Sequence, residues 1–423
     1  MQVGLGQLAN MRRTGTPRGI TSVCSAHPVV LRAALRHGKA TGATVLIEAT
    51  CNQVNHEGGY TDMVPAAFFA LVETIAREEH CPMTQVILGG DHLGPNPWRD
   101  QAAEAALSKA EEMVSAYVAA GFSKIHLDCS MGCAGEPAAL DDETTASRAV
   151  RLARVAEDTA RKTGNAMPTY VIGTEVPPPG GADHALTTIE PTAADAAKNT
   201  LAVHREKFAK EGLSDAFERV VGIVVQPGVE FGNHNVIRYE RDKAASLIKV
   251  LDDEPNIVFE AHSTDYQGSA PLAELVDDGF AILKVGPELT FVLREALYAL
   301  DLIASDIIAG YGARPLKAAI EDIMVRQPDN WASHYDGDTS TQHVLRHYSL
   351  SDRIRYYWAT DAAQSAVADL MTAMKGQVVP LPVMWQHFAG AEAFADEPLD
   401  PEALLIWSIT ESLKSYHTAC NLS

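Results

Sequence analysis

An aspartate and a histidine lie side by side in the segment Gly89-Gly90-Asp91-His92-Leu93-Gly94-Pro95, directly after the apolar residues 86–88. Adjacent residues of a regular strand point to opposite faces. The pair can therefore reach one pocket only where the strand ends and the backbone turns, and the flanking glycines permit such a turn. We predict that His92 is a metal ligand and that Asp91 is an acid/base group.

Polar residues also end several later apolar runs. His234 and His262 follow two of these runs, and Glu175 ends a run between Asp91 and His234. A single histidine at a strand end is more often a hydrogen-bonded core residue, but imidazoles and carboxylates that converge on one point form a metal site. Four other histidines lack such neighbours and are expected to be structural: His27, His56, His126 and His184.

The chemistry that such a site can perform follows from its residue types. A divalent metal held by imidazoles, with one open position, polarises a carbonyl or hydroxyl group and stabilises an enediolate. A carboxylate such as Asp91 within reach could move a proton. Together, the metal and the carboxylate could break and remake a carbon–carbon bond beside a ketone. Metal-assisted hydrolysis needs the same ligands, so the residue types leave both reactions open.

The elements that must position these residues form a repeat of short apolar run, polar loop and helical segment. Eight such units are expected, with strands at residues 19–24, 44–50, 85–89, 124–128, 170–175, 220–225, 257–262 and 281–285. Eight parallel units close into a (β/α)8 barrel. An open doubly wound sheet would bind its ligand at one switch point, whereas here almost every strand ends in polar residues. We predict the TIM barrel.

The alternation stops near residue 305, and helical stretches then alternate with polar or proline-rich loops. We predict a barrel over residues 1–304 and a mostly helical C-terminal extension over residues 305–423. No G-x-G-x-x-G and no G-x-x-x-x-G-K-[ST] motif follows a strand, which argues against a dinucleotide site and a P-loop kinase.

Composition excludes some partners. The net charge of −21 argues against a nucleic-acid surface, because phosphate backbones are bound by clustered Lys and Arg. The six cysteines are dispersed, as expected for reduced thiols in the cytosol. No apolar stretch approaches the ~20 residues needed to cross a membrane. We expect a cytoplasmic protein with no membrane contact.

The motifs carry a family resemblance. Asp91-His92, Glu175, His234 and His262 in that order, with Lys284-Val285-Gly286 on the last strand, resemble class II, metal-dependent fructose- and tagatose-bisphosphate aldolases. The whole chain is more similar to the GatZ/KbaZ family. That similarity is carried by Glu48-Ala49-Thr50-Cys51-Asn52-Gln53-Val54-Asn55, Gly58-Gly59-Tyr60-Thr61, the segment from Gly89 to Pro95, His126-Leu127-Asp128 and Ser351-Asp352-Arg353-Ile354-Arg355-Tyr356-Tyr357-Trp358.

Members of that family are described as tagatose 6-phosphate kinases, as the non-catalytic subunit of tagatose-1,6-bisphosphate aldolase or, in related branches, as C4 epimerases of ketohexose phosphates or uronates. The resemblance implies a divalent metal, zinc favoured, on His92, His234 and His262, with Glu175 as a further ligand. Catalytic roles are expected for Asp91, Asp128 and Glu175. Substrate-binding roles are expected for Glu48, Asn52, Gln53, Asp265, Lys284, Arg353 and Arg355.

One motif departs from the aldolase pattern. His262 is followed by Ser263-Thr264-Asp265-Tyr266-Gln267 rather than by a Gly-Gly-Ser-Gly loop, and a carboxylate there would repel a phosphate. A single phosphate could instead be held by backbone N–H groups of residues 286–290 or by Arg353 and Arg355. The expected substrate is therefore a ketohexose monophosphate rather than a bisphosphate.

The expected function is retro-aldol and aldol chemistry on a ketohexose 6-phosphate, which epimerises C4 between tagatose 6-phosphate and fructose 6-phosphate. The alternative is a non-catalytic subunit that stabilises a separate class II aldolase. A scaffolding subunit has no need of metal ligands, and this sequence carries every candidate, which favours an enzyme. The expected partners are a sugar phosphate, a catalytic aldolase subunit under the alternative, and further copies of the chain.

Overall fold

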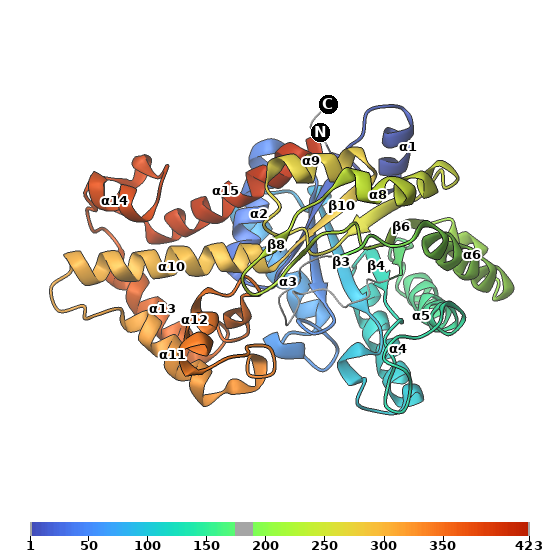
Figure 1. The fold of residues 1–423 in the computed structure, drawn as a ribbon, viewed down its shortest axis with the longest axis horizontal. Helices are drawn as coiled ribbons and strands as arrows, with labels where there is room; N and C mark the ends of the chain where they lie inside the picture. Colours follow the sequence, from blue (N-terminus) through green and yellow to red (C-terminus); the bar gives the residue numbers. More distant parts are fainter. Residues whose placement is uncertain (1, 174–188, 422–423) are drawn as a thin grey trace.

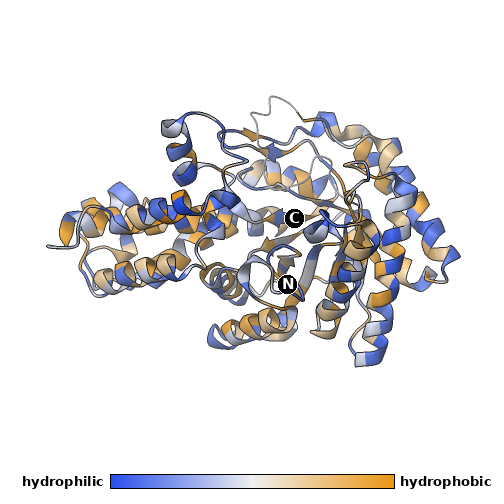
Figure 2. Cartoon of the chain, turned by 90° about the horizontal axis from the view of Figure 1, so that it is seen from below, coloured by the Kyte–Doolittle hydropathy of each residue, from blue (hydrophilic) through white to orange (hydrophobic). Residues whose placement is uncertain are grey.

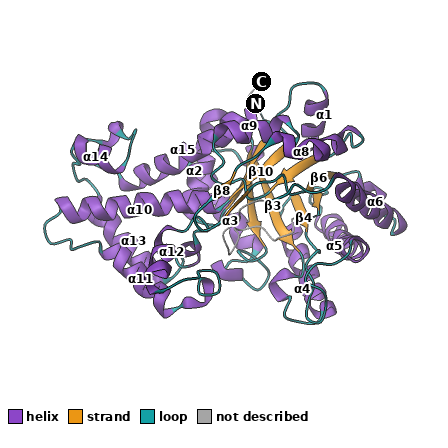
Figure 3. Ribbon diagram, viewed as in Figure 1, coloured by secondary structure: helices purple, strands orange, loops and turns teal. Residues whose placement is uncertain are grey.

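The computed structural model describes residues 2–173 and 189–421. Eight parallel strands close into a barrel in the order β1-β10-β9-β6-β5-β4-β3-β2, and helices surround it (Figure 1, Figure 3). The strands are β1 (Ile20–Cys24), β2 (Val45–Thr50), β3 (Val86–Leu93), β4 (Lys124–Leu127), β5 (Thr169–Ile172), β6 (Val220–Val224), β9 (Val258–Ala261) and β10 (Phe280–Val285). The predicted (β/α)8 barrel is confirmed.

Each predicted strand has a counterpart, but two short strands were not expected. The strands β7 (Glu230–Phe231) and β8 (Val236–Ile237) pair antiparallel in the loop after β6. Two residues are too few to give a recognisable alternation of apolar and polar positions. This hairpin lies at the carboxyl end of β6, where the barrel places functional loops.

The barrel helices begin and end at residues suited to helix termini. Helix α2 starts at Pro28, a favoured first helical residue, and stops at Gly42, whose φ is 67°. The helices are amphipathic, with hydrophilic and hydrophobic residues interleaved along each (Figure 2). They are α1 (Leu8–Arg13), α2 (Pro28–Thr41), α3 (Pro65–Glu78), α4 (Ala103–Ala119), α5 (Asp142–Thr163), α6 (Ala194–Lys210), α7 (Ser214–Phe217), α8 (Arg241–Ile248), α9 (Ser269–Asp277) and α10 (Pro287–Ile307).

The barrel interior is layered because alternate side chains of each strand point inward. The layer nearest the amino ends of the strands is apolar and packs against the N-terminal segment, with the residues Val3, Leu5, Leu8, Ile20, Leu46, Val258 and Ile282. Two residues further along the strands, the layer is polar and buried: Ser22, Glu48, Lys124, Glu260 and Lys284. The next layer reaches the carboxyl ends, where the candidate site lies.

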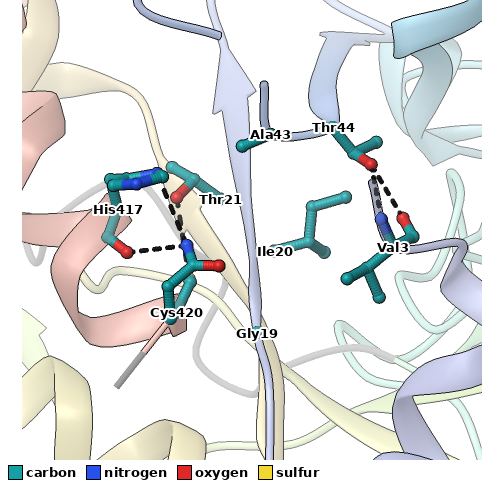
Figure 4. A pocket seen from close by; sticks show the side chains of 9 residues that line it. Val3, Gly19, Ile20, Thr21, Ala43, Thr44, His417 and Cys420 are labelled. Atoms are coloured by element: carbon teal, nitrogen blue, oxygen red, sulfur yellow. Dashed lines mark hydrogen bonds between the residues drawn. The ribbon is translucent and has the colours of Figure 1, made fainter. Parts of the chain in front are cut away.

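A small cavity lies at the opposite, amino end of the strands (Figure 4). Its lining includes Ile20 at the start of β1, Thr44 before β2, and His417 and Cys420 from the last helix. Because functional side chains of a barrel gather at the carboxyl ends of its strands, this cavity belongs to the structural face of the molecule.

The C-terminal extension is helical, as predicted, and consists of α11 (Pro315–Arg326), α12 (Thr339–Tyr348), α13 (Asp361–Met374), α14 (Leu381–His387) and α15 (Pro401–Asn421). Helices α11 to α14 project to one side with the distal half of α10 (Figure 1). Helix α15 instead returns to the barrel wall, where it packs against α2, α9 and α10, and the Cys420 carbonyl accepts the Gly19 N–H at 3.0 Å. Helix α15, which is 21 residues long, thus covers the barrel itself.

Two further findings bear on the sequence-based expectations. No helix in residues 2–173 and 189–421 is long and apolar enough to span a bilayer. All six cysteines are free thiols, and five of them are buried.

Candidate active site at the carboxyl ends of the strands

Four side chains converge at the carboxyl ends of β3, β4 and β9: Asp91, His92, His126 and His262. One ligand atom from each lies within 4.8 Å of the others. The ring centroid of His92 is 4.8 Å from that of His262 and 4.9 Å from that of His126. Three imidazoles and a carboxylate at one point can form a metal site, and two of these imidazoles, His92 and His262, belong to the ligands predicted from the sequence.

The Asp91–His92 pair reaches this point through a β-bulge rather than at a strand end. Gly90 pairs with Ile125 and Leu93 with Leu127, so Asp91 and His92 together face the single residue His126 on β4. His92 takes a φ of 51°, which turns its side chain toward the same pocket as that of Asp91. The prediction that β3 ends before the pair was wrong, since a bulge redirects a side chain without ending the strand.

The glycines before the pair supply space rather than a turn. A Cβ on Gly89 would lie 2.8 Å from Cγ of Glu48, and a Cβ on Gly90 would lie 2.5 Å from a methyl group of Leu93. Neither glycine has a positive φ, whereas His92 does. These positions require glycine because neighbouring side chains fill the space that any side chain of their own would occupy.

Asp128 orients His92. Oδ2 of Asp128 lies 2.7 Å from Nδ1 of His92, so that Nε2 points to the side of Asp91, whose Oδ2 is 3.9 Å away. Burial opposes the charged ring, but the carboxylates of Asp91 and Asp128 outweigh it and raise the pKa of His92. A carboxylate behind a ligating histidine is the usual support of a metal site. Asp128, predicted to be catalytic, therefore lies in a supporting position.

His126 locks the bulge. Its Nε2 lies 2.8 Å from the Gly173 carbonyl and donates to it, and its Nδ1 accepts the His92 backbone N–H at 3.1 Å. Oδ1 of Asp91 is 3.0 Å from the same Nδ1. The structural role expected for His126 agrees with these hydrogen bonds, but its ring also borders the cluster, which the sequence did not indicate.

A buried ionic layer lies directly beneath the cluster. Nζ of Lys284 is 2.8 Å from Asp91 and 3.1 Å from Glu48. Nζ of Lys124 is 2.7 Å from Glu48 and 2.7 Å from Glu260. Burial opposes ionisation of Asp91, but the Lys284 ammonium dominates and holds the pKa of Asp91 well below its usual value. Buried ions of this kind are tolerated only when each is paired.

His262 is the neutral imidazole of the cluster. Burial, which outweighs the hydrogen bond to Glu260, lowers the pKa of His262 to about 3. Oε1 of Glu260 is 3.0 Å from Nε2 of His262, so a metal on His262 would be held through Nδ1. A neutral ring with a carboxylate on its other nitrogen is the form that binds metal ions.

The charges of the site also suit a cation. Among the described residues, four carboxylates of the two layers (Glu48, Asp91, Asp128 and Glu260) face two ammonium groups (Lys124 and Lys284). A divalent cation beside Asp91, His92 and His262 would balance the excess negative charge. The residues present therefore fit a divalent metal.

The family model for the D-tagatose-1,6-bisphosphate aldolase subunit GatZ/KbaZ-like proteins matches residues 5–421 of this chain. The chain belongs to the GatZ/KbaZ-like family. This confirms the resemblance inferred from its motifs. A D-tagatose 6-phosphate 4-epimerase of Agrobacterium fabrum is 57% identical over 415 residues, which cover 98% of each chain. The crystal structure of a probable tagatose 6-phosphate kinase from Sinorhizobium meliloti superposes with a TM-score of 0.87 at 50% identity, covering 95% of this chain and 100% of the other.

Of the two further ligands expected from the aldolase resemblance, the structure of this GatZ/KbaZ-like protein describes one, His234. Glu175 lies outside the described residues, as does His184. His234 is exposed in the loop between β7 and β8 and is absent from the groups of potential ligands found in the described residues. The adjacent Asn233 carbonyl accepts the Leu350 N–H at 3.1 Å, which ties the loop to the extension. The metal role of His234 stays a prediction that requires this loop to move.

Asp265 caps a helix rather than facing the cluster. Its Oδ1 accepts the N–H groups of Gly286 and Glu288 at 3.0 and 2.8 Å. Burial, with a contribution from Glu288, raises the pKa of Asp265 to about 7. The amino terminus of α10 is thus occupied by the chain's own carboxylate. The alternative that residues 286–290 bind a phosphate is not supported, because two of their N–H groups already have this acceptor.

The residues after β2 line the rim of the barrel. Gln53 holds the strand end, since its Oε1 accepts the Thr50 N–H at 2.9 Å, and Asn52 is exposed beside it. Glu48 and Lys284 lie deeper, with side-chain exposures of 0% and 5% in the ionic layer. Of these four predicted substrate-binding residues, Asn52 is the exposed one.

The two arginines from the extension differ in position. They belong to the turn η7 (Arg353–Tyr356). Nη1 of Arg353 donates to the Asn330 carbonyl within the extension at 3.0 Å. Arg355 instead lies beside the loop after β2, where Tyr60 interacts with Arg355 and Gln53 and the rings of Tyr60 and Tyr356 are 4.7 Å apart. The extension therefore places Arg355 at the barrel rim.

Sequence reasoning did not single out Lys124 or Glu260. The alternation of side-chain directions along the strands could have identified both residues. Lys124, His126 and Asp128 occupy alternate positions of β4 and its end, and Glu260 and His262 are two residues apart. Residues two apart in a strand share a face, so a functional His262 implies that Glu260 also points into the barrel.

Glu230 of β7 follows the sixth predicted strand, and sequence reasoning assigned it no role. Its side chain is buried, and burial raises its pKa to about 7. Ser263, directly after His262, interacts with it. Glu230 is thus a buried carboxyl group beside the strand end that carries His262.

Proposed function

We propose that this protein is a metal-dependent epimerase that inverts C4 of a ketohexose 6-phosphate and thereby interconverts D-tagatose 6-phosphate and D-fructose 6-phosphate. The observation that carries the proposal is the convergence of the Asp91 carboxylate with the imidazoles of His92 and His262 at the barrel mouth. The 57% identical relative named as a tagatose 6-phosphate 4-epimerase supports the substrate. The kinase name of the structural relative has less support, because no G-x-x-x-x-G-K-[ST] motif occurs in the sequence.

The metal would be held by His92 and His262, with Glu175 and His234 as the further ligands we propose, and zinc suits this set of imidazoles and a carboxylate. A divalent cation bound there supplies Lewis-acid polarisation of the substrate's carbonyl and hydroxyl oxygens. The chain's own contribution is orientation. Asp128 fixes the ring of His92, and Glu260 fixes the ring of His262.

Asp91 is the proposed proton acceptor. It would take the proton of the C4 hydroxyl group while the C3–C4 bond breaks and its electron pair moves toward the C2 carbonyl, giving the enediolate of dihydroxyacetone and glyceraldehyde 3-phosphate. After the aldehyde turns over, the bond forms on its other face, and Asp91 returns the proton to the C4 oxygen. Lys284 keeps Asp91 ionised between turnovers, so it is ready to accept a proton at neutral pH.

Arg355 is the proposed phosphate ligand. Asp265 occupies the α10 terminus, and Arg353 bonds within the extension, whereas Arg355 lies at the rim beside Tyr60. A guanidinium group suits a phosphate because its N–H groups bind two oxygens at once. Holding the phosphate of the aldehyde fragment would keep that fragment in place while its carbonyl turns over, which distinguishes an epimerase from an aldolase that releases both halves.

The test uses the full chain purified alone, stripped with a chelator and then reloaded with zinc or another divalent metal. D-Tagatose 6-phosphate should be converted to D-fructose 6-phosphate by the reloaded protein, with activity lost on chelation and little free glyceraldehyde 3-phosphate released. Absence of turnover with every metal would overturn the proposal. If the same inactive preparation increased the activity of a separate class II aldolase, the non-catalytic subunit role in the family's name would be supported instead.

A further inference from the structure

Three cations gather where α10 meets the extension: Arg294 of α10, Arg314 at the N-cap of α11 and Lys317 in the first turn of α11. They surround the rings of two tyrosines. The guanidinium of Arg294 lies 5.9 Å from the ring centroids of both Tyr298 and Tyr348. Arg314 lies 5.5 Å from the Tyr298 ring, and Nζ of Lys317 lies 5.3 Å from the Tyr348 ring. We call these three residues the extension cation cluster.

Two of the three cations of the cluster have no carboxylate partner among the described residues. Within residues 2–173 and 189–421, no salt bridge joins Arg314 or Lys317 to a carboxylate, and Nε of Arg314 is buried without a hydrogen-bond partner. Arg294 is buried and pairs through Nε with Asp352 at 3.1 Å, but its Nη2 has no partner. Buried N–H groups without acceptors are costly, so an acceptor supplied by a ligand would stabilise these two groups.

Two carboxylates on the same helices, those of Asp301 and Glu321, are already engaged. Asp301 accepts the N–H groups of Leu316 and Lys317 at 3.3 and 3.0 Å and so caps α11. Glu321 is held by both branches of the Arg346 guanidinium. The chain as a whole has a net charge of −21. Cations without carboxylate partners therefore give this place a positive potential that differs from that of the rest of the protein.

Tyr348 adds a hydroxyl group to the same place. The residue is 46% exposed, so this side of the cluster is open to solvent. Its phenol interacts with both Lys317 and Arg314, which overcome its burial and lower the pKa of Tyr348. The Arg314 guanidinium, the Lys317 ammonium and the Tyr348 phenol thus meet at one place. Each of them can donate a hydrogen bond, which is the chemistry that recognises a phosphate group.

The position is distinct from the proposed active site. Thr290 in the first turns of α10 bonds Asp352 near the barrel mouth at 2.7 Å, and Tyr298 follows eight residues later on the same helix. At 1.5 Å per residue, Tyr298 lies roughly 12 Å further out along the axis. Figure 1 shows α10 carrying this segment, with α11 and α12, away from the barrel.

We propose that Arg314, Lys317 and Tyr348, backed by Arg294, form a second anion site that binds a small molecule through its phosphate group. The proposal does not rest on the epimerase function. Arg294 also holds Asp352, whose carbonyl accepts from Arg355 at 3.2 Å. Arg294, Asp352 and Arg355 thereby connect this site to the rim of the barrel.

Radiolabelled inorganic phosphate in equilibrium dialysis at constant ionic strength tests the site. The full-length Arg355→Gln variant removes the proposed active-site phosphate ligand, so that the extension site is measured alone. It should bind one phosphate per chain. Adding Arg314→Gln and Lys317→Gln should weaken that binding at least tenfold. Lys162→Gln, which removes an exposed charge from α5 on the barrel, is the matched control and should leave it unchanged.

A second variant guards against loss of structure. Tyr348→Phe keeps the ring that Lys317 covers and removes only the hydroxyl group, and it should weaken phosphate binding several-fold with an unchanged circular dichroism spectrum. Absence of saturable binding in the Arg355→Gln protein would overturn the proposal. Equal affinity in the Arg314→Gln, Lys317→Gln protein would do the same, because the bound phosphate would then lie elsewhere.

Discussion

The carboxylate of Asp91 lies 2.8 Å from Nζ of Lys284, a residue on the far side of the same barrel, and joins the imidazole cluster to the ionic layer beneath it. Asp91 faces His126 on one side and the lysine on the other. The lysine also contacts Glu48 and Glu260. The acid/base group is thus held in one orientation by a fixed charge rather than by solvent, which is the preorganisation that catalysis in a buried site requires.

Asp91→Asn should abolish most of the epimerase activity. The amide keeps the shape of the side chain but cannot accept the C4 hydroxyl proton, and general base catalysis contributes about 10²–10⁴-fold. We expect kcat to fall by about this factor with a folded protein, measured by coupled assay of fructose 6-phosphate. A kcat within a few-fold of the wild-type value would show that another group moves the proton.

His92→Ala should remove the metal while leaving the barrel folded, because the ring lies at the end of the strand layer and its loss does not open the ionic layer below. Metal per chain, measured by inductively coupled plasma mass spectrometry after dialysis, should fall from about one to near zero. His387→Ala on the remote helix α14 is the matched control and should keep its metal. Stoichiometric metal in the His92 variant would place the site elsewhere.

Lys124→Met should destabilise the fold, since it leaves Glu48 and Glu260 buried with one ammonium between them. Removing one partner of a buried ion pair costs about 3–5 kcal/mol. Urea unfolding followed by circular dichroism measures the loss. The surface change Lys162→Met should alter the free energy of unfolding by less than about 0.5 kcal/mol, and a similarly small effect for Lys124→Met would mean that water reaches the ionic layer.

Glu230 makes stability depend on pH. Burial raises its pKa to about 7 in the folded protein from 4.5 in the unfolded chain. The folded state therefore binds this proton more tightly, and its contribution is complete below pH 4.5 and is lost as the pH rises through about 7. The loss is on the order of 3 kcal/mol. Glu230→Gln should flatten the profile of unfolding free energy between pH 5 and 8.

Asp265, whose pKa is also raised to about 7 by burial, titrates in the same window. The Glu230 variant should therefore reduce the pH dependence rather than remove it, and the Glu230→Gln, Asp265→Asn double variant should reduce it further. Parallel profiles for the wild type and the Glu230 variant would contradict the assignment.

Arg355→Gln should affect phosphorylated substrates selectively. Loss of a guanidinium that binds a phosphate should lower kcat/KM for tagatose 6-phosphate by about 10²-fold, or roughly 3 kcal/mol. Turnover of unphosphorylated tagatose, measured in parallel, should be the same in the variant and the wild type. Arg353→Gln, two residues away in η7 and bonded to the Asn330 carbonyl, serves as the matched control. An equal loss with both sugars would indicate that Arg355 acts through the fold.

Much of the fold could be predicted because it depends on local patterns. Each barrel strand is a run of apolar residues bounded by polar or glycine positions, and the helices begin and end at residues such as Pro28 and Gly42 that favour helix termini. The return of α15 to the barrel could not be predicted. Its apolar face suits any apolar groove, and nothing local distinguishes the barrel wall from the rest of the extension.

The sequence by itself determined the TIM barrel, the family and the presence of Asp91, His92 and His262 at the carboxyl ends of strands, because alternation and strand direction place those residues whatever the details of packing. Tertiary structure alone decided which of them meet. It made the β-bulge that turns Asp91 and His92 into one pocket, put Asp265 on a helix terminus, and left His234 exposed on a loop tied to the extension. These outcomes depend on contacts between segments far apart in the chain, and a local pattern carries no information about such contacts.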